Sequence, residues 1–290
     1  MTASTSTPLP TYFISHGGGP WPWIKDQMPF DLSVLEASLQ AIPDEIGVTP
    51  KAVLVVSGHW EAPEFTVQTT AKPPMIYDYG GFPEFTYHIQ YPAPGSPEVA
   101  QRVTDLLDAA GITNRQDPDR GYDHGVYAPM YVVYPEADVP ILQLSLKHGY
   151  SPEQHLAVGR ALAPLRNEGV LIIGSGLSYH NLRLMGPAAE VPSQQFDRWL
   201  THALVESSPA QRSQLLRDWE TAPSARIAHP AEDHLIPLMV AVGAAEGEVG
   251  VRGYHEETVF GSVTASSFRF GEVASTGSEA DSERRVVEPA

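Results

Sequence analysis

Cysteine is absent from the sequence, so disulfides, zinc–thiolate sites and a cysteine nucleophile are excluded. Basic residues are scarce: 18 lysines and arginines stand against 35 aspartates and glutamates, and the formal net charge is −17. A surface of this sign repels nucleic-acid phosphates, so we expect no nucleic-acid partner. No apolar run approaches the roughly 18–20 residues that a membrane span requires. The first ten residues have neither the basic nor the apolar region of a secretory signal. We therefore expect a cytoplasmic protein without a membrane partner.

The remaining composition is that of a globular chain. It has 290 residues, of which 42% are hydrophobic, enough to bury a large core. Strand-like and helix-like segments alternate along most of the sequence, which predicts a single α/β domain. We place this domain at residues 10–271, between a flexible N-terminus (1–9) and an acidic tail (272–290) that we expect to be disordered. The main expected elements are buried strands over 10–15, 52–56 and 170–173, and helices over 97–110, 151–167 and 228–245.

Histidines recur where the predicted strands end. His16, His59 and His180 each follow an apolar strand, at or just beyond the glycine that closes it. Ligands of open α/β sheets bind outside the carboxyl ends of the strands, so adjacent parallel strands would bring these imidazoles together. His229 and His234 lie where a helix is expected to begin, and His124 lies in a glycine-bracketed loop.

Such a cluster predicts a particular kind of metal site. Neutral imidazole is the commonest metal ligand near neutral pH, and histidines without cysteine suit Fe(II), Zn, Mn or Ni rather than Mg or Ca. A single histidine at a strand end is more often a hydrogen-bonding residue, so the prediction depends on several of them converging. Five other histidines lack this context, and we assign them to the surface or the core: His88, His148, His155, His202 and His255.

A long segment rich in tyrosine, phenylalanine, proline and glycine spans residues 63–95. Loops of this length are usually functional or disordered, and the aromatic residues favour function. Beside a metal, these rings would suit an aromatic substrate. We predict that Trp60, Tyr127 and His229 contact the substrate. Arg120 and Lys147 are candidates for binding a substrate carboxylate.

Taken together, these motifs resemble a known family. From about Tyr12 to Phe270 the sequence carries, in order, SHGGGP at 15–20, SGHW at 57–60, DHG at 123–125, GSG…HN at 174–181 and HP…DH at 229–234. This series resembles the DOPA-dioxygenase branch of the class III (LigB-type) extradiol ring-cleavage dioxygenases. The resemblance implies a single α/β domain with a central mixed sheet flanked by helices, so that residues 10–271 would be the catalytic domain.

The resemblance also implies roles for individual residues. Its metal positions match His16, His59 and His234; its acid/base histidine matches His180; and His124 matches a further active-site histidine. The metal is Fe(II) in active members of the family, although zinc is often taken up in its place. Related enzymes use a glutamate as the third ligand, so Glu232 or Asp233 could replace a histidine as a ligand here.

The implied reaction is cleavage of a small catechol by O2 to a muconic semialdehyde. A DOPA-like or other para-substituted catechol is the substrate that the resemblance suggests, with His180 moving the phenolic proton. Two alternatives stay open at this point: a zinc hydrolase that uses the same three histidines, and a non-catalytic metal-binding protein of the same fold. The sequence leaves open which catechol is used, which bond is cleaved, the native metal and the oligomeric state.

Overall fold

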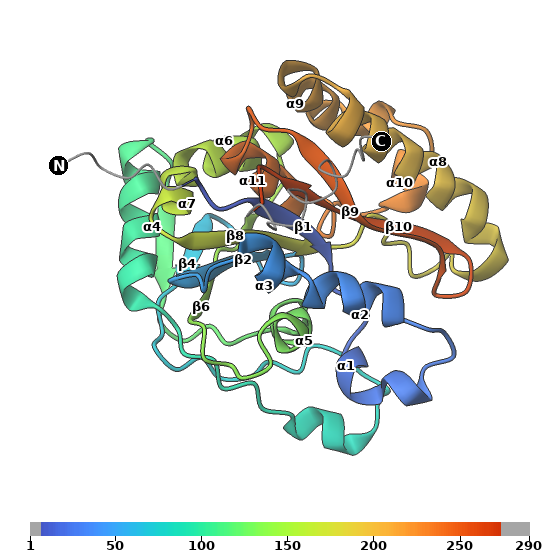
Figure 1. The fold of residues 1–290 in the computed structure, drawn as a ribbon, viewed down its shortest axis with the longest axis horizontal. Helices are drawn as coiled ribbons and strands as arrows, with labels where there is room; N and C mark the ends of the chain where they lie inside the picture. Colours follow the sequence, from blue (N-terminus) through green and yellow to red (C-terminus); the bar gives the residue numbers. More distant parts are fainter. Residues whose placement is uncertain (1–6, 274–290) are drawn as a thin grey trace, which may run out of the picture.

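A six-stranded mixed sheet forms the centre of the computed structural model, which describes residues 7–273 (Figure 1). The strand order is β6-β2-β8-β1-β10-β9. β6, β2, β8 and β1 run parallel, whereas β10 is antiparallel to both β1 and β9. The strands of this sheet are β1 (Thr11–Ser15), β2 (Ala52–Ser57), β6 (Ile141–Gln143), β8 (Val170–Gly176), β9 (Gly250–Val259) and β10 (Val263–Phe270). The predicted central mixed sheet is therefore confirmed.

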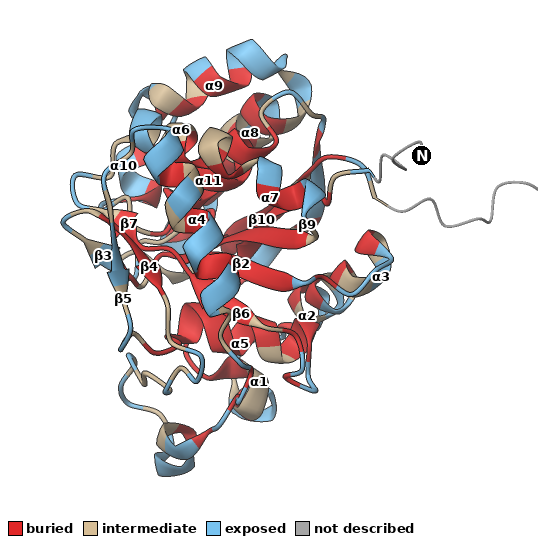
Figure 2. Ribbon diagram, turned by 90° about the vertical axis from the view of Figure 1, so that its left-hand side faces the viewer, coloured by how far each residue is buried: buried red, intermediate tan, exposed pale blue. Residues whose placement is uncertain are grey.

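The parallel strands are covered on both faces. Every residue of β1, β2 and β8 is buried, as expected for strands whose apolar runs leave no solvent face. α11 (Pro237–Ala244) packs on β8, β1 and α6 (Pro152–Leu162), and α5 (His124–Val133) contacts β2 and β8. Figures 1 and 2 show the helices as layers on either side of the sheet, with their exposed faces turned outward.

The remaining elements connect or flank these layers. Short pairs of parallel strands lie outside the main sheet, where β3 pairs with β7 and β4 with β5. The bounds are α1 (Trp21–Ile24), α2 (Ser33–Gln40), α3 (Ile42–Ile46), β3 (Glu61–Ala62), β4 (Phe65–Gln68), α4 (Pro97–Ala109), β5 (Asn114–Asp117), β7 (Leu146–Lys147), α7 (Pro164–Asn167), α8 (Glu190–Thr201), α9 (Pro209–Arg217) and α10 (Ala225–Ala228).

The structure confirms the helix caps that the sequence predicts for α4, but not the single helix predicted over 151–167. The Ser96 side chain accepts a hydrogen bond from the Val99 N–H at the start of α4, and Gly111 follows its end with a φ of +69°, as its capping role requires. The single helix expected over 151–167 is instead divided into α6 and α7. Pro164 begins the second helix, because proline has no N–H to continue the first.

The helix predicted over 228–245 begins later than expected. α11 starts only at Pro237, in the first-turn position that proline favours. His234 lies in the turn before it, and its carbonyl accepts the N–H of Leu177 beyond β8. This bond ties the turn that carries His234 to the end of β8. The turn consequently stays next to the carboxyl ends of the parallel strands.

The predicted terminal segments fall mainly outside the described residues. Residues 1–6 of the expected flexible N-terminus and 274–290 of the expected tail are not described. Leu9 is buried. Its N–H bonds the Arg166 carbonyl and its carbonyl accepts from Arg166 Nε, so Leu9 belongs to the fold rather than to a flexible segment. Among residues 7–273, no helix has the length and apolarity needed to cross a bilayer.

One structural histidine gives a prediction about stability. His155 is buried on α6, where Nδ1–H donates to the Ser151 carbonyl and Nε2 accepts the N–H of Lys147. Burial lowers its pKa to about 4. In the unfolded chain the pKa of this histidine is about 6.5, so as the pH falls the unfolded state is protonated at a higher pH than the folded state. The free energy of unfolding is therefore unaffected by this group above pH 6.5 and falls as the pH drops toward 4.

Urea unfolding of the wild type and of a His155→Gln variant at pH 7 and pH 4.5 tests this expectation. The wild type should lose roughly 2–3 kcal/mol more than the variant between the two pH values. Equal losses would show that His155 does not carry this pH dependence.

Candidate metal centre

The backbone brings three strand ends and one turn to a single place. His16 directly follows β1, and its N–H bonds the Gly176 carbonyl of β8, which extends the parallel ladder. His59 follows β2 by two residues, and between them Gly58 bonds back to β8. A Cβ at Gly58 would lie 2.9 Å from the Asp233 carbonyl oxygen. Glycine therefore allows the His59 turn and the His234 turn to approach closely.

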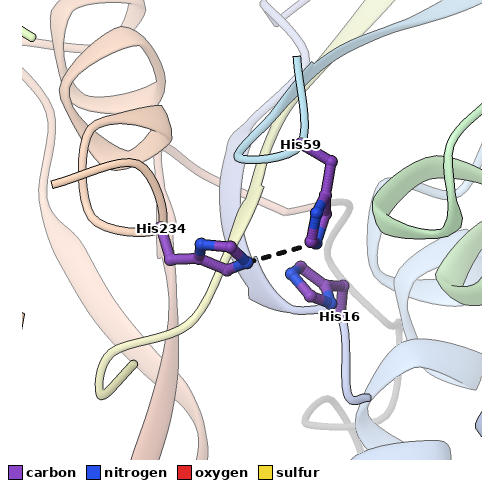
Figure 3. Close-up of side chains that lie close together, drawn as sticks. All are labelled: His16, His59 and His234. Atoms are coloured by element: carbon purple, nitrogen blue, oxygen red, sulfur yellow. Dashed lines mark hydrogen bonds between the residues drawn. The ribbon is translucent and has the colours of Figure 1, made fainter. Parts of the chain in front are cut away.

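His16, His59 and His234 converge at this place (Figure 3). One ring nitrogen from each lies within 4.8 Å of the others, and the Nε2 atoms of His59 and His234 are 3.1 Å apart. The ring centroids are separated by 5.0 Å (His16–His59), 5.2 Å (His16–His234) and 4.6 Å (His59–His234). His16 and His234 are buried and His59 is partly buried.

The electrostatics of these imidazoles fit a metal ion. Burial, together with the neighbouring histidines, lowers the pKa of His16 and of His234 well below the ordinary value. Burial lowers the pKa of His59 to about 3. All three rings are therefore neutral near pH 7 and offer lone pairs. Both ring nitrogens of His16 are buried without a hydrogen-bond partner in the described structure. Unpaired buried nitrogens are costly, and a bound cation would satisfy one of them.

Two further histidines border the cluster. The His180 ring stacks on His234, with centroids 3.4 Å apart and an interplanar angle of 16°. His180 keeps 18% of its side chain exposed, and burial lowers its pKa against the opposing effect of Asp233. His124 begins α5, and its ring centroid lies 4.0 Å from that of His59. The structure thus brings all five predicted metal and acid/base histidines together.

Two carboxylates touch this group. Asp233 Oδ2 is hydrogen-bonded to His234 Nδ1 and lies 3.8 Å from His180 Nδ1. Its neighbour Glu232 instead pairs with Arg226 at 2.6 Å. Asp78 accepts a hydrogen bond from His124 Nδ1 at 2.8 Å.

Asp78 also lies 3.4 Å from His59 Nδ1. Burial would raise its pKa, but hydrogen bonding and charge interactions with His124, together with the charge interaction with His59, outweigh burial and lower it. In the sequence, only the aromatic rings of residues 63–95 indicated a function, and this carboxylate was missed.

A buried network fixes the turn that carries His59. Asp123 accepts hydrogen bonds from the Ser57 hydroxyl and from the Arg120 guanidinium, both at 2.7 Å. Arg120 also donates to the His59 carbonyl at 3.3 Å and lies over the Trp60 ring, 5.0 Å from its centroid. Arg120, a candidate for binding a substrate carboxylate, is therefore already engaged in holding the turn.

The residues predicted to bind substrate are mostly enclosed. Tyr127 is fully buried and donates its hydroxyl hydrogen to the Tyr79 hydroxyl at 2.8 Å. His229 is fully buried as well, with Nε2–H on the Ser178 carbonyl, and its ring lies against Phe196 and Trp219. Lys147, the other carboxylate-binding candidate, pairs with Glu64 at 2.9 Å. Substrate contact by Trp60, Tyr127 and His229 stays a prediction.

Comparison with known proteins identifies the family. Residues 11–271 match the family described as the catalytic LigB subunit of aromatic ring-opening dioxygenase. The chain belongs to the LigB family. Its LigB relatives include a 4,5-DOPA dioxygenase extradiol of Beta vulgaris, 39% identical over 90% of this chain and 96% of that protein. Another, of the same name, is from Escherichia coli K12, 32% identical over 92% and 96% of the two chains.

Further relatives agree with this assignment. Dioxygenase tasH of Hapsidospora irregularis is 37% identical over 88% of this chain and 84% of its own. The crystal structure of the uncharacterized protein JW3007 from Escherichia coli K12 superposes with a TM-score of 0.72 at 28% identity, covering 91% of this chain and all of that one. These findings confirm the predicted class, an extradiol ring-cleaving dioxygenase that acts on an aromatic substrate with O2, and they favour it over a zinc hydrolase. LigB dioxygenases depend on a metal, and the histidine cluster could bind one.

Proposed function

We propose that this LigB-family chain is a non-haem Fe(II) extradiol dioxygenase that opens the ring of a para-substituted, DOPA-like catechol to a muconic semialdehyde. The observation that carries the proposal is the convergence of three neutral, largely buried imidazoles at the strand ends, with one ring nitrogen of each within 4.8 Å of the others. The proposed substrate is supported by relatives at 32–39% identity that are named for 4,5-DOPA.

His16, His59 and His234 would hold the ion. When bound, it would supply Lewis acidity toward the two catechol oxygens and a route for electrons between the ring and O2. Neutral imidazoles suit Fe(II) and also Zn(II), so zinc in a purified sample is compatible with the proposal.

The proton chemistry falls to His180 and His124. Nδ1 of His180 faces Asp233, which leaves Nε2 to take a phenolic proton and to return it when the ring opens. A neutral imidazole suits this role because it can accept a proton at one ring nitrogen and later release it. His124 uses Nδ1–H toward Asp78, so its Nε2 lone pair can accept a hydrogen bond from the second hydroxyl. Tyr79, whose ring centroid is 5.8 Å from that of His124, would help exclude water on that side.

The function is tested by oxygen uptake. Protein loaded anaerobically with Fe(II) should consume one O2 per DOPA-like catechol converted and form a yellow semialdehyde. The same protein loaded with Zn(II) is the control and should remain inactive. An iron-loaded protein that consumes no oxygen with any member of a catechol panel would overturn the proposal.

Asp233 and Glu232, which precede His234, allow two neighbouring substitutions to be compared. We expect Asp233→Asn to weaken metal binding by about 10–100-fold, because it removes the negative charge and one acceptor oxygen of the carboxylate that orients a metal-binding histidine. Glu232→Gln should leave metal affinity near the wild-type value, since Glu232 pairs with Arg226 instead. Competition titrations with Zn(II) measure both variants. The reverse order of effects would indicate that Glu232 is the residue that serves the metal.

A further inference from the structure

Asp78 is placed between two histidines of different predicted roles. Its Oδ1 accepts hydrogen bonds from both the backbone N–H (3.1 Å) and the Nδ1–H (2.8 Å) of His124. Its Oδ2 lies 3.4 Å from Nδ1 of His59. One carboxylate thus faces the Nδ1 atoms of a predicted metal ligand and of a predicted active-site histidine.

The contacts leave Asp78 little freedom. The bond from the His124 backbone fixes Oδ1 at the start of α5, and 22% of the side chain is exposed. A carboxylate can accept from both imidazoles but donate to neither. The His124 ring is thereby held in the tautomer that carries the proton on Nδ1. The charge of Oδ2 keeps the Nδ1 side of the His59 ring toward Asp78, so that its Nε2 is directed to the side where His234 Nε2 lies, 3.1 Å away.

We propose that Asp78 is a positioning residue that orients His59 for metal binding and sets the tautomer and orientation of His124 for substrate contact. This inference rests on the proposed function for the roles of the two histidines. Asp78 itself lies on the Nδ1 sides of both rings, so it supports the metal site without being a ligand. Metal-binding histidines commonly donate their second ring N–H to a carboxylate in this way.

A similar arrangement occurs on the other side of the cluster. Asp233 is hydrogen-bonded to Nδ1 of His234 and lies 3.8 Å from Nδ1 of His180. Each carboxylate therefore faces one predicted metal ligand and one predicted acid/base or substrate histidine. Asp78 lies in the aromatic segment 63–95, whereas Asp233 lies in the turn before α11. Because these segments are far apart in the chain, the similar placement of the two carboxylates does not arise from a local repeat.

The test compares Asp78→Asn with Glu84→Gln. Glu84 also lies within the aromatic segment 63–95, but it is exposed and pairs with the exposed His88. In Asp78→Asn, one acceptor oxygen becomes a donor, and we expect Zn(II) affinity to fall by about 10–100-fold. Glu84→Gln should bind Zn(II) as the wild type does. An unchanged affinity in Asp78→Asn would overturn the inference. A loss as large as that of His59→Ala would also overturn it, because Asp78 would then be a ligand.

A second measurement reads the tautomer directly. Long-range ¹⁵N–¹H spectra of the metal-free wild type should show His124 with the proton on Nδ1, and Asp78→Asn should shift it to Nε2. An Nε2–H tautomer of His124 in the wild type would contradict the inference. Tautomer and Zn(II) affinity are measured without catechol. Failure of ring cleavage alone would therefore overturn the proposed function, whereas failure of these two readings alone would overturn the role of Asp78.

Discussion

His16→Ala is expected to abolish stoichiometric metal binding and, with it, oxygen uptake. His16 contributes one of three converging nitrogens, and among residues 7–273 neither of its ring nitrogens has a hydrogen-bond partner. In the proposed site, its loss would remove a ligand rather than a supporting contact. The affinity should therefore fall by more than the roughly 10–100-fold associated with residues that orient ligands. Metal content per chain after gel filtration, measured by mass spectrometry, is the readout.

The control for this variant is His202→Ala. His202 keeps 59% of its side chain exposed and pairs with Glu206, away from the cluster, so its replacement should leave metal content unchanged. Circular dichroism of metal-free His16→Ala should match the wild type, because removing an unpaired buried polar group adds no unsatisfied contact. Wild-type metal content in a folded His16→Ala protein would refute its role as a ligand.

His180→Ala is expected to lower turnover while leaving metal binding intact. Its ring stacks on His234 but lies outside the group of three nitrogens, so the variant should retain the metal. Loss of a general acid/base typically costs about 10²–10⁴-fold in turnover, and we expect a decrease in kcat of that size. Stopped-flow oxygen consumption at matched iron content measures it. Turnover at the wild-type rate with iron bound would show that His180 does not move the proton.

The place of the histidine cluster could be predicted from the sequence, because ligands of open α/β sheets bind at the carboxyl ends of the strands. His16, His59 and His180 follow β1, β2 and β8, which are adjacent and parallel, so their ends had to meet at one edge. His234 was placed by its position before an apolar helix, although the structure holds it in a turn whose carbonyl bonds Leu177. The assignment of roles within the group came from the family resemblance and not from spacing.

Other features depended on contacts that no local pattern records. Asp78 lies in an irregular loop, and only the packing of that loop against the start of α5 brings it to His124. Arg120 looked free to bind a substrate carboxylate, because a sequence does not show that Asp123 neutralises it. Pro164 marks the division between α6 and α7 in the sequence. Helical periodicity continues on both sides of it, however, and predicted one helix instead of two.

The central claim is that three histidines hold a single catalytic metal ion. X-ray absorption at the iron edge of anaerobically loaded protein tests it most directly, since imidazole scattering counts the histidines bound. We predict one Fe(II) per chain with three imidazole ligands, and the loss of one imidazole in any His16, His59 or His234 variant that still retains iron. Wild-type iron bound by fewer than three imidazoles, or no iron retained at all, would contradict the account.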